Sequence, residues 1–158
     1  MVVTVSQLNA ILSACGYAAV DGELADIVVR WTNVAIHDPN EAAMFIAHFI
    51  HETGGFQHRW AINPPQSTWD YDCRDACNNI YGYDNSLQNV AEDVTTKRLL
   101  FWLKRVCPSE APFNFYLTTK VINGEVETSS SHPSAKKRYR LYLKAADVLG
   151  VQNLASEG

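Results

Sequence analysis

EAAMFIAHFIHETGGF, residues 41–56, is the stretch that decides the fold, because its side chains are almost all apolar and indicate a helix buried on most sides. The helix carries one carboxylate near its end, Glu52, shortly before Gly54 and Gly55, and glycine is typical of helix ends. Burial raises the pKa of a carboxyl group, and the negative end of the helix dipole raises it further. We therefore expect Glu52 to be partly protonated near neutral pH, which is the state that a general acid needs.

Helical periodicity also governs most of the remaining sequence. Thr4 followed by Gln7 forms a capping-box pattern that begins the first helix, and Asn40 can cap the central helix. Pro133 opens the last helix and Gly150 ends it. The expected helices cover residues 4–15, 23–35, 41–53, 72–80, 87–106 and 133–149.

The intervening segments carry turn residues rather than a strand pattern. Residues 54–68 contain a glycine pair and a proline pair and should be irregular, and residues 112–127 should be helical in part at best. No segment shows a convincing alternation of apolar and polar residues. We therefore expect residues 1–158 to form a mainly α, multi-helix single domain with little or no β-sheet, ending in a flexible tail at 152–158.

Composition narrows the class of function. Of the 158 residues, 47% are hydrophobic and 19% are charged, which is typical of a globular protein. The formal net charge is −4, whereas a nucleic-acid-binding protein should present a basic surface. No apolar run is long enough to span a membrane, and the N-terminus lacks the features of a signal peptide. We expect no nucleic-acid or membrane partner, and an intracellular protein and a trimmed, secreted one both remain open.

The spacing of cysteines and histidines does not indicate a metal centre. Four cysteines allow three disulfide pairings, but Cys73 and Cys77 would stand side by side on a helix, where a bridge is awkward. His48, His51 and Glu52 lie close together on one helix, yet their order is not the HExxH of zinc hydrolases. A structural role for these histidines is favoured over metal ligation. We expect no metal site and no cofactor.

Four motifs resemble, in the same order, those of the family 19 glycoside hydrolases, the plant-type chitinases. They are AHFIHETGGF (47–56), QSTWDYD (66–72), TTKVING (118–124) followed by Glu127, and Arg138 with Tyr142 ahead of VLGV (148–151). The resemblance implies a lysozyme-like, mainly α fold. It also implies hydrolysis of β-1,4-linked N-acetylglucosamine polymers with inversion of configuration.

The resemblance implies roles for individual residues. Glu52 corresponds to the general acid, which protonates the leaving oxygen. Glu127 and Arg138 would form a buried polar network that holds the acid and sets its protonation. Amides and hydroxyls suit sugar binding, because sugars present hydroxyl and N-acetyl groups. The side chains expected to bind substrate are His51, Trp60, Gln66, Thr68, Tyr71 and Asn123.

One part of the family pattern is missing. An inverting hydrolase needs a second carboxylate, which activates water and stands about 6.5–9.5 Å from the acid. Residues 57–65 read QHRWAINPP, without a carboxylate, where family members would be expected to carry acidic residues. Asp70 and Asp72 are the nearest substitutes, although neither lies where the family places its water. Loss of a general base slows a reaction by about 10²–10⁴-fold.

Two classes of function therefore remain open from the sequence. The chain is either an inverting endochitinase with weakened activity or a non-catalytic protein that binds chitin oligosaccharides in a retained cleft. A peptidoglycan lysin on the same scaffold is a more distant third alternative. In the first two cases the partner is chitin or N-acetylglucosamine oligomers, and we expect a monomer.

Overall fold

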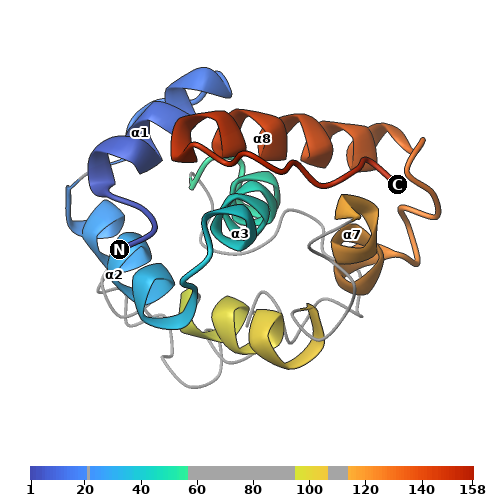
Figure 1. Ribbon diagram of the computed structural model, residues 1–158, viewed down its shortest axis with the longest axis horizontal. Coiled ribbons are helices and arrows are strands. Elements are labelled where there is room, and N and C mark those ends of the chain that lie inside the picture. Colours follow the sequence, from blue (N-terminus) through green and yellow to red (C-terminus); the bar gives the residue numbers. More distant parts are fainter. Residues whose placement is uncertain (21, 57–94, 107–113) are drawn as a thin grey trace.

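The computed structural model describes residues 1–20, 22–56, 95–106 and 114–158 (Figure 1). These residues are mainly helical and contain no β-strand, only a bridge between Asn114 and Ser156. The mainly α class predicted from the sequence is thus confirmed for this part of the chain, while the lysozyme-like arrangement and the single domain remain predictions. The elements are α1 (Val5–Ala14), α2 (Gly22–Ala35), α3 (Pro39–Thr53), the π-helical turn η2 (Trp102–Val106), α7 (Phe115–Asn123) and α8 (Pro133–Leu149).

α3 is the central helix. Figure 1 shows it nearly end-on, with α1, α2, α7 and α8 arranged around it. Its side chains from Ala42 to Ile50 are all buried, and all except His48 are apolar. A helix enclosed on every side needs apolar residues around its whole circumference, which explains the composition of this stretch. α8 is the helix that packs most extensively against it.

The N-terminus of α3 differs from the prediction by its capping residue. Asp38, rather than Asn40, is the N-cap, and its carboxylate accepts a hydrogen bond from the Glu41 amide at 2.9 Å. The helix begins earlier than expected because Pro39 suits the first helical position, where no N–H is needed. Asn40 instead accepts a hydrogen bond from the Tyr142 hydroxyl at 2.6 Å, which ties α3 to α8.

The turn after α3 has a left-handed backbone, which two of its three residues, Gly54 and Gly55, adopt without strain. Residues 54–56 all have positive φ. Glycine is required at Gly55, because a Cβ there would overlap the ring of Tyr17, in the segment after α1. The Thr53 hydroxyl accepts a hydrogen bond from the Phe56 amide at 3.0 Å and so helps to hold the turn. The end of the helix that carries the candidate acid is therefore fixed on two sides.

Two of the predicted segments differ in the structure, and parts of the prediction lie outside the described residues. Residues 115–123, expected to be helical in part at best, form the regular helix α7, because Phe115 and Ile122 are buried and packing outweighs a weak helical propensity. In the helix expected at 87–106, residues 95–101 are α-helical and continue into η2. Residues 87–94 and the helix expected at 72–80 lie outside the described residues.

The C-terminal residues, where a flexible tail is expected at 152–158, make defined contacts. The Ala155 amide donates to the Tyr142 hydroxyl at 2.8 Å, and Ala155 is buried. The Ser156 carbonyl accepts a hydrogen bond from the Phe115 amide at 2.8 Å. These contacts connect the end of the chain to α8 and α7.

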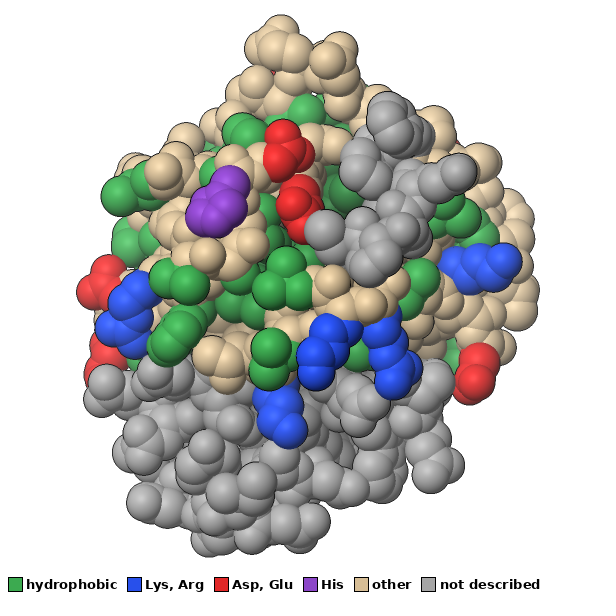
Figure 2. All heavy atoms as spheres, turned by 60° about the horizontal axis from the view of Figure 1, so that its bottom comes forward, with side chains coloured by type: hydrophobic (Ala, Val, Ile, Leu, Met, Phe, Trp, Pro, Cys, Tyr) green, Lys and Arg blue, Asp and Glu red, His purple; other side chains and the backbone are tan. Residues whose placement is uncertain are grey.

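The surface of the described residues is mixed in character. On the face shown in Figure 2, hydrophobic side chains lie across the middle, acidic side chains lie above them and at both edges, and most basic side chains lie below them. Exposed large hydrophobic side chains include Leu100 and Leu103 in the segment 95–106. No helix in the described part of the chain is long and apolar enough to cross a bilayer.

Candidate functional site

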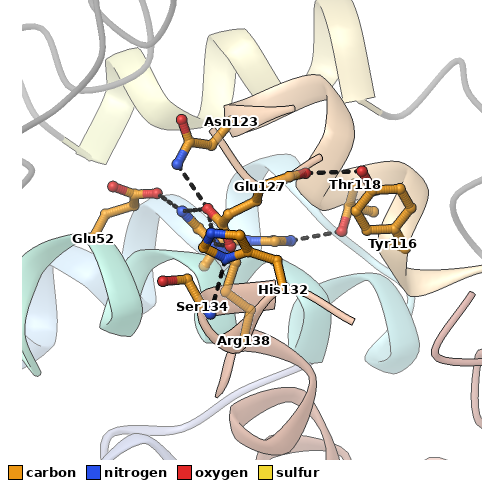
Figure 3. Close-up of polar contacts among 9 residues, drawn as sticks. Glu52, Tyr116, Thr118, Asn123, Glu127, His132, Ser134 and Arg138 are labelled. Carbon is orange, nitrogen blue, oxygen red and sulfur yellow. Dashed lines mark hydrogen bonds and ion pairs between the residues drawn. The ribbon is translucent and has the colours of Figure 1, made fainter. Parts of the chain in front are cut away.

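The candidate site is a buried polar cluster between α3, α7 and α8. Glu52 lies in the last turn of α3, Arg138 near the start of α8, and Glu127 in the loop that joins α7 to α8. The exposed fractions of Glu52, Arg138 and Glu127 are 7%, 1% and 0%. Figure 3 shows the three side chains converging from separate elements. The structure thus brings together the residue predicted as the acid and the two predicted to support it.

Arg138 is the centre of the cluster. Its Nε donates to both carboxylate oxygens of Glu127, at 2.9 and 3.0 Å, and its Nη2 lies 2.9 Å from Glu127 Oε2. Nη2 also donates to Glu52 Oε1. One guanidinium is therefore shared by two carboxylates, and its planar, fork-like geometry orients both. Burial alone would lower the pKa of Arg138, but the charges and hydrogen bonds of Glu52 and Glu127 raise it overall, so the side chain stays protonated.

The ionisation of Glu52 differs from the sequence-based expectation. Burial raises the pKa of its carboxyl group, as predicted, but the positive charges of Arg138 and Arg98 outweigh burial and leave that pKa below its ordinary value. The prediction of a partly protonated Glu52 near neutral pH is therefore wrong for this state, because it considered only burial and the helix dipole, whereas the guanidinium of Arg138 acts in the opposite direction and outweighs them. Glu52 Oε2 has no hydrogen-bond partner among the described residues and points away from Arg138 (Figure 3).

His48 extends the cluster toward α7. Its Nδ1 lies 3.1 Å from Arg138 Nη1, and its Nε2 lies 2.6 Å from Thr118 Oγ1. Because a guanidinium can only donate, Nδ1 must accept, so the proton of the neutral ring is on Nε2 and is donated to Thr118. The Thr118 hydroxyl donates in turn to the Phe115 carbonyl at 2.6 Å. Burial, with the charge of Arg138, keeps the pKa of His48 well below its ordinary value, which agrees with a neutral ring.

Two of the predicted substrate-binding residues lie beside the cluster. Asn123, at the end of α7, donates through Nδ2 to Glu127 Oε2 at 2.7 Å, while its Oδ1 has no partner in the described part of the chain. His51 precedes Glu52, and its Nδ1 has no partner there either. Burial, reinforced by the charge of Arg138, lowers the pKa of His51 to about 3, so its ring is neutral. Each residue therefore keeps a buried hydrogen-bonding atom that has no partner among the described residues.

In comparisons with known proteins, no family model, no curated protein and no solved structure matches this chain. The relation to the family 19 glycoside hydrolases therefore rests on the sequence motifs and stays a prediction. The structure adds the mainly α fold and the geometry of the buried cluster.

The remaining predicted site residues lie outside the described part of the chain. They include both candidates for a substitute base and four of the residues expected to bind sugar. They are Asp70, Asp72, Trp60, Gln66, Thr68 and Tyr71. Within the described ranges, no group of three or more His, Cys, Asp or Glu side chains could hold a metal ion.

Three side chains contribute to the cluster although the sequence-based prediction assigned them no role there. His48 is expected there to be structural, yet it contacts Arg138 directly, and its spacing of four residues from Glu52 is a signal that both lie on one face of the helix. Thr118 appears in a motif without an assigned contact. Arg98 is fully buried with its guanidinium 4.9 Å from the centre of the Phe49 ring. A spacing of four residues from Val94 and from Trp102 places Arg98 on the apolar face of the expected helix, a signal that Lys104 and Arg105 lack.

Proposed function

We propose that this chain is a glycoside hydrolase, related to the family 19 chitinases, which cleaves β-1,4-linked N-acetylglucosamine polymers with inversion and uses Glu52 as the general acid. The observation that carries this proposal is the sharing of Arg138 by Glu52 and Glu127 (Figure 3). A pair that served only stability would not need two buried carboxylates on one cation, since surplus buried charge is unfavourable. The arrangement instead supports a carboxyl group held at one oxygen and available at the other.

Proton transfer requires that Glu52 become neutral before it reacts. In the free protein the neighbouring positive charges lower the pKa of Glu52. A neutral sugar seated against Oε2 would displace water, and desolvation favours the protonated acid. Arg138 would remain charged and paired in that state, because it also binds Glu127 through Nε and Nη2. Glu52 then gives its proton to the glycosidic oxygen as the bond to that oxygen breaks.

Attack by water on the opposite face of the sugar calls for a second carboxylate. We assign this role to Asp70 or Asp72, the first carboxylates that follow the acid motif in the sequence, since residues 57–65 contain none. An aspartate in this role would stand about 6.5–9.5 Å from Glu52. If neither serves, hydrolysis falls by about 10²–10⁴-fold, because water must then attack unassisted.

One observation favours a second function, the binding of chitin oligosaccharides without hydrolysis. The lowered pKa of Glu52 leaves it ionised in the free protein, and an ionised carboxylate cannot donate a proton. The same unpaired atoms, Asn123 Oδ1 and His51 Nδ1, would then serve only to bind the hydroxyl and N-acetyl groups of the sugar.

Release of reducing ends from chitin hexamer separates the two functions. Glu52→Gln keeps the size of the side chain and can still accept from Arg138, but its amide cannot act as an acid. We expect the wild type to be about 10²–10⁴-fold faster than this variant. Glu23→Gln, at an exposed site in α2, is the matched control and should behave as the wild type.

A wild type no faster than Glu52→Gln would overturn the hydrolase proposal. Calorimetry with the same hexamer then tests the binding function. Measurable heat of binding would support a lectin-like protein, and its absence would exclude that function as well.

A further inference from the structure

We propose that His48 is a positioning residue for the proposed reaction: it holds the guanidinium of Arg138 where that group reaches Glu52 and Glu127 at the same time. For its effect on turnover, this inference rests on the proposed function. Its effect on the geometry of Arg138 and on the ionisation of Glu52 can be measured whether or not the protein hydrolyses chitin.

The hydrogen-bond donors of Arg138 are satisfied on different sides. Nε faces Glu127, and Nη2 is divided between Glu127 and Glu52. Nη1 points toward α3, where its acceptor among the described residues is His48 Nδ1, at 3.1 Å. A buried donor without an acceptor is unfavourable. Without Nδ1, the guanidinium would turn to find another partner and would draw Nη2 away from Glu52.

The acceptor atom of His48 is itself held in place. The ring is fully buried and stacks on Phe115, with centroids 4.9 Å apart and planes 3° apart. Trp102 lies against it with a centroid distance of 6.1 Å. The hydrogen bond from Nε2 to Thr118 then fixes which edge of the ring, the one with Nδ1, meets Arg138. The imidazole can neither flip nor shift without losing these contacts.

The hydrogen bonds form a chain in which every donor points the same way. Arg138 donates to His48, His48 to Thr118, and Thr118 to the Phe115 carbonyl. The chain ends on the backbone of α7, so the position of the guanidinium is tied to a rigid element. Residues that only fill space need no such order, and the aromatic surroundings of His48 would accept an apolar side chain as readily.

Charge around His48 favours the neutral ring that this chain needs. The charged or titratable groups that act on it are Arg138 from α8 and His51 from α3 itself, and both disfavour a proton on Nδ1. No carboxylate contacts the ring among the described residues. A protonated His48 could not accept from Arg138, so the positioning contact exists only while the ring is neutral.

Two amide substitutions separate the two hydrogen bonds of His48. The side-chain amide of His48→Asn falls near Nδ1, so this variant keeps an acceptor for Arg138 and loses Thr118. The longer amide of His48→Gln falls near Nε2, so it keeps Thr118 and loses the acceptor for Arg138. Both variants lose the ring contacts equally. His37→Asn removes an exposed imidazole and is the matched control.

Two measurements are made on each variant: kcat and KM on chitin hexamer, and the titration of the Glu52 carboxyl carbon by ¹³C NMR. We expect kcat to fall about 10–100-fold in His48→Gln with little change in KM, since misplacing a supporting group chiefly affects the reacting geometry. We expect His48→Asn to recover most of this loss. The titration midpoint of Glu52 should rise in His48→Gln and stay near that of the wild type in His48→Asn.

Equal behaviour of the two amide variants in both measurements would overturn the positioning role. If the wild type does not cleave the hexamer, the proposed function fails, and the Glu52 titration still decides the role of His48. If neither variant folds, ¹⁵N NMR of the wild-type imidazole decides it instead. A proton on Nε2 with an unprotonated Nδ1 supports the inference, and a proton on Nδ1 overturns it.

Discussion

The buried part of α3 has two halves, residues 42–47 and residues 48–53, which differ in the side chains that they contain. From Ala42 to Ala47 every side chain is apolar and belongs to the hydrophobic core. Beyond Ala47, the side chains of His48, Glu52 and Thr53 are polar and also buried. The first half packs against rings and methyl groups, whereas the second half meets hydrogen-bonding groups from α7 and α8. Burial by itself therefore does not determine what a position on this helix can carry.

What differs is the partner opposite each half. Phe45, in the first half, lies against Trp102 with ring centroids 5.6 Å apart. Glu52, in the second half, lies against Arg138. A carboxylate in the first half would lose its charge, because desolvation would act alone. In the second half the same desolvation is outweighed by a cation, so the charge is kept. Four predictions test this contrast, from the largest expected effect to the smallest.

Arg138→Met should have the largest effect, because it leaves Glu52 and Glu127 buried without their cation. Removing one member of a buried ion pair costs about 3–5 kcal/mol of stability. The proposed hydrolysis should be lost as well, since nothing would orient Glu52. Urea unfolding and reducing-end release measure the two effects. Arg140→Met, at an exposed site on the same helix, is the control. If Arg138→Met were as stable as the wild type, the distinction between the two halves would not hold.

Phe45→Ala tests the apolar half. Phe45 is fully buried between the rings of Phe49 and Trp102, so its truncation should cost about 3–5 kcal/mol in urea unfolding. The activity per folded molecule should be unchanged, because Phe45 has no polar atom in its side chain and takes part in none of the hydrogen bonds of the cluster. Val34→Ala, at a site 62% exposed, is the control. Lost activity in a fully folded Phe45→Ala sample would contradict the separation of the halves.

Acidification should lower the stability of the folded protein through the titrating groups of the polar half. The pKa of His48 lies well below its ordinary value, and that of His51 is about 3, whereas both titrate near 6.5 when unfolded. Below about pH 6.5 the unfolded chain binds more protons, so stability, complete above that pH, falls as the pH falls. Each histidine contributes a slope of about 1.4 kcal/mol per pH unit. Glu52, whose pKa is also lowered, loses its contribution at still lower pH, as the pH falls through its folded pKa.

Urea unfolding at pH 7, 6 and 5 measures this slope. His48→Asn should reduce it by about one proton, because one of the two neutral histidines is then absent. His37→Asn, at an exposed site, should leave it unchanged. A free energy of unfolding that does not vary between pH 7 and pH 5 would contradict the assignment of two buried, neutral rings.

Ile46→Val should have the smallest effect. It removes one methylene group from a side chain that is 1% exposed, which costs about 0.5–1.5 kcal/mol. The activity and the pH slope should both match those of the wild type. Thermal and urea unfolding measure the change. A change in the slope of the unfolding free energy against pH would show that the apolar half is coupled to the titrating residues and would contradict the separation of the two halves.

Much of the fold could be predicted from local signals. The Thr4–Gln7 capping box and the left-handed Gly150 define the start of α1 and the end of α8, and both are present as predicted. α7 was harder to predict, because FYLTTKVIN is rich in aromatic and β-branched residues and is helical through its packing. The N-cap at Asp38 was missed because Asn40, two residues later, is also a favourable capping residue. Pro39, which suits the first helical position, is the signal that places the cap at Asp38.

The site could be predicted as a set of residues but not as an electrostatic state. The motifs named Glu52, Glu127 and Arg138 together, and the structure places them in contact. The direction of the Glu52 pKa could not be read from its own helix, because the cation that lowers it comes from α8. The role of His48 depends on its tautomer, which is set by partners on two other helices.

The contact between Gly55 and Tyr17 makes the position of Glu52 dependent on the N-terminal segment of the chain. The turn that ends α3 is seated on the ring of Tyr17, which belongs to the connection after α1. A chimaera that took its first two helices from another protein would have to supply an aromatic ring of the same reach, or the last turn of α3 would move and carry Glu52 with it. Directed evolution of this protein can therefore adjust the position of Glu52 through Tyr17, without altering any residue of the polar cluster.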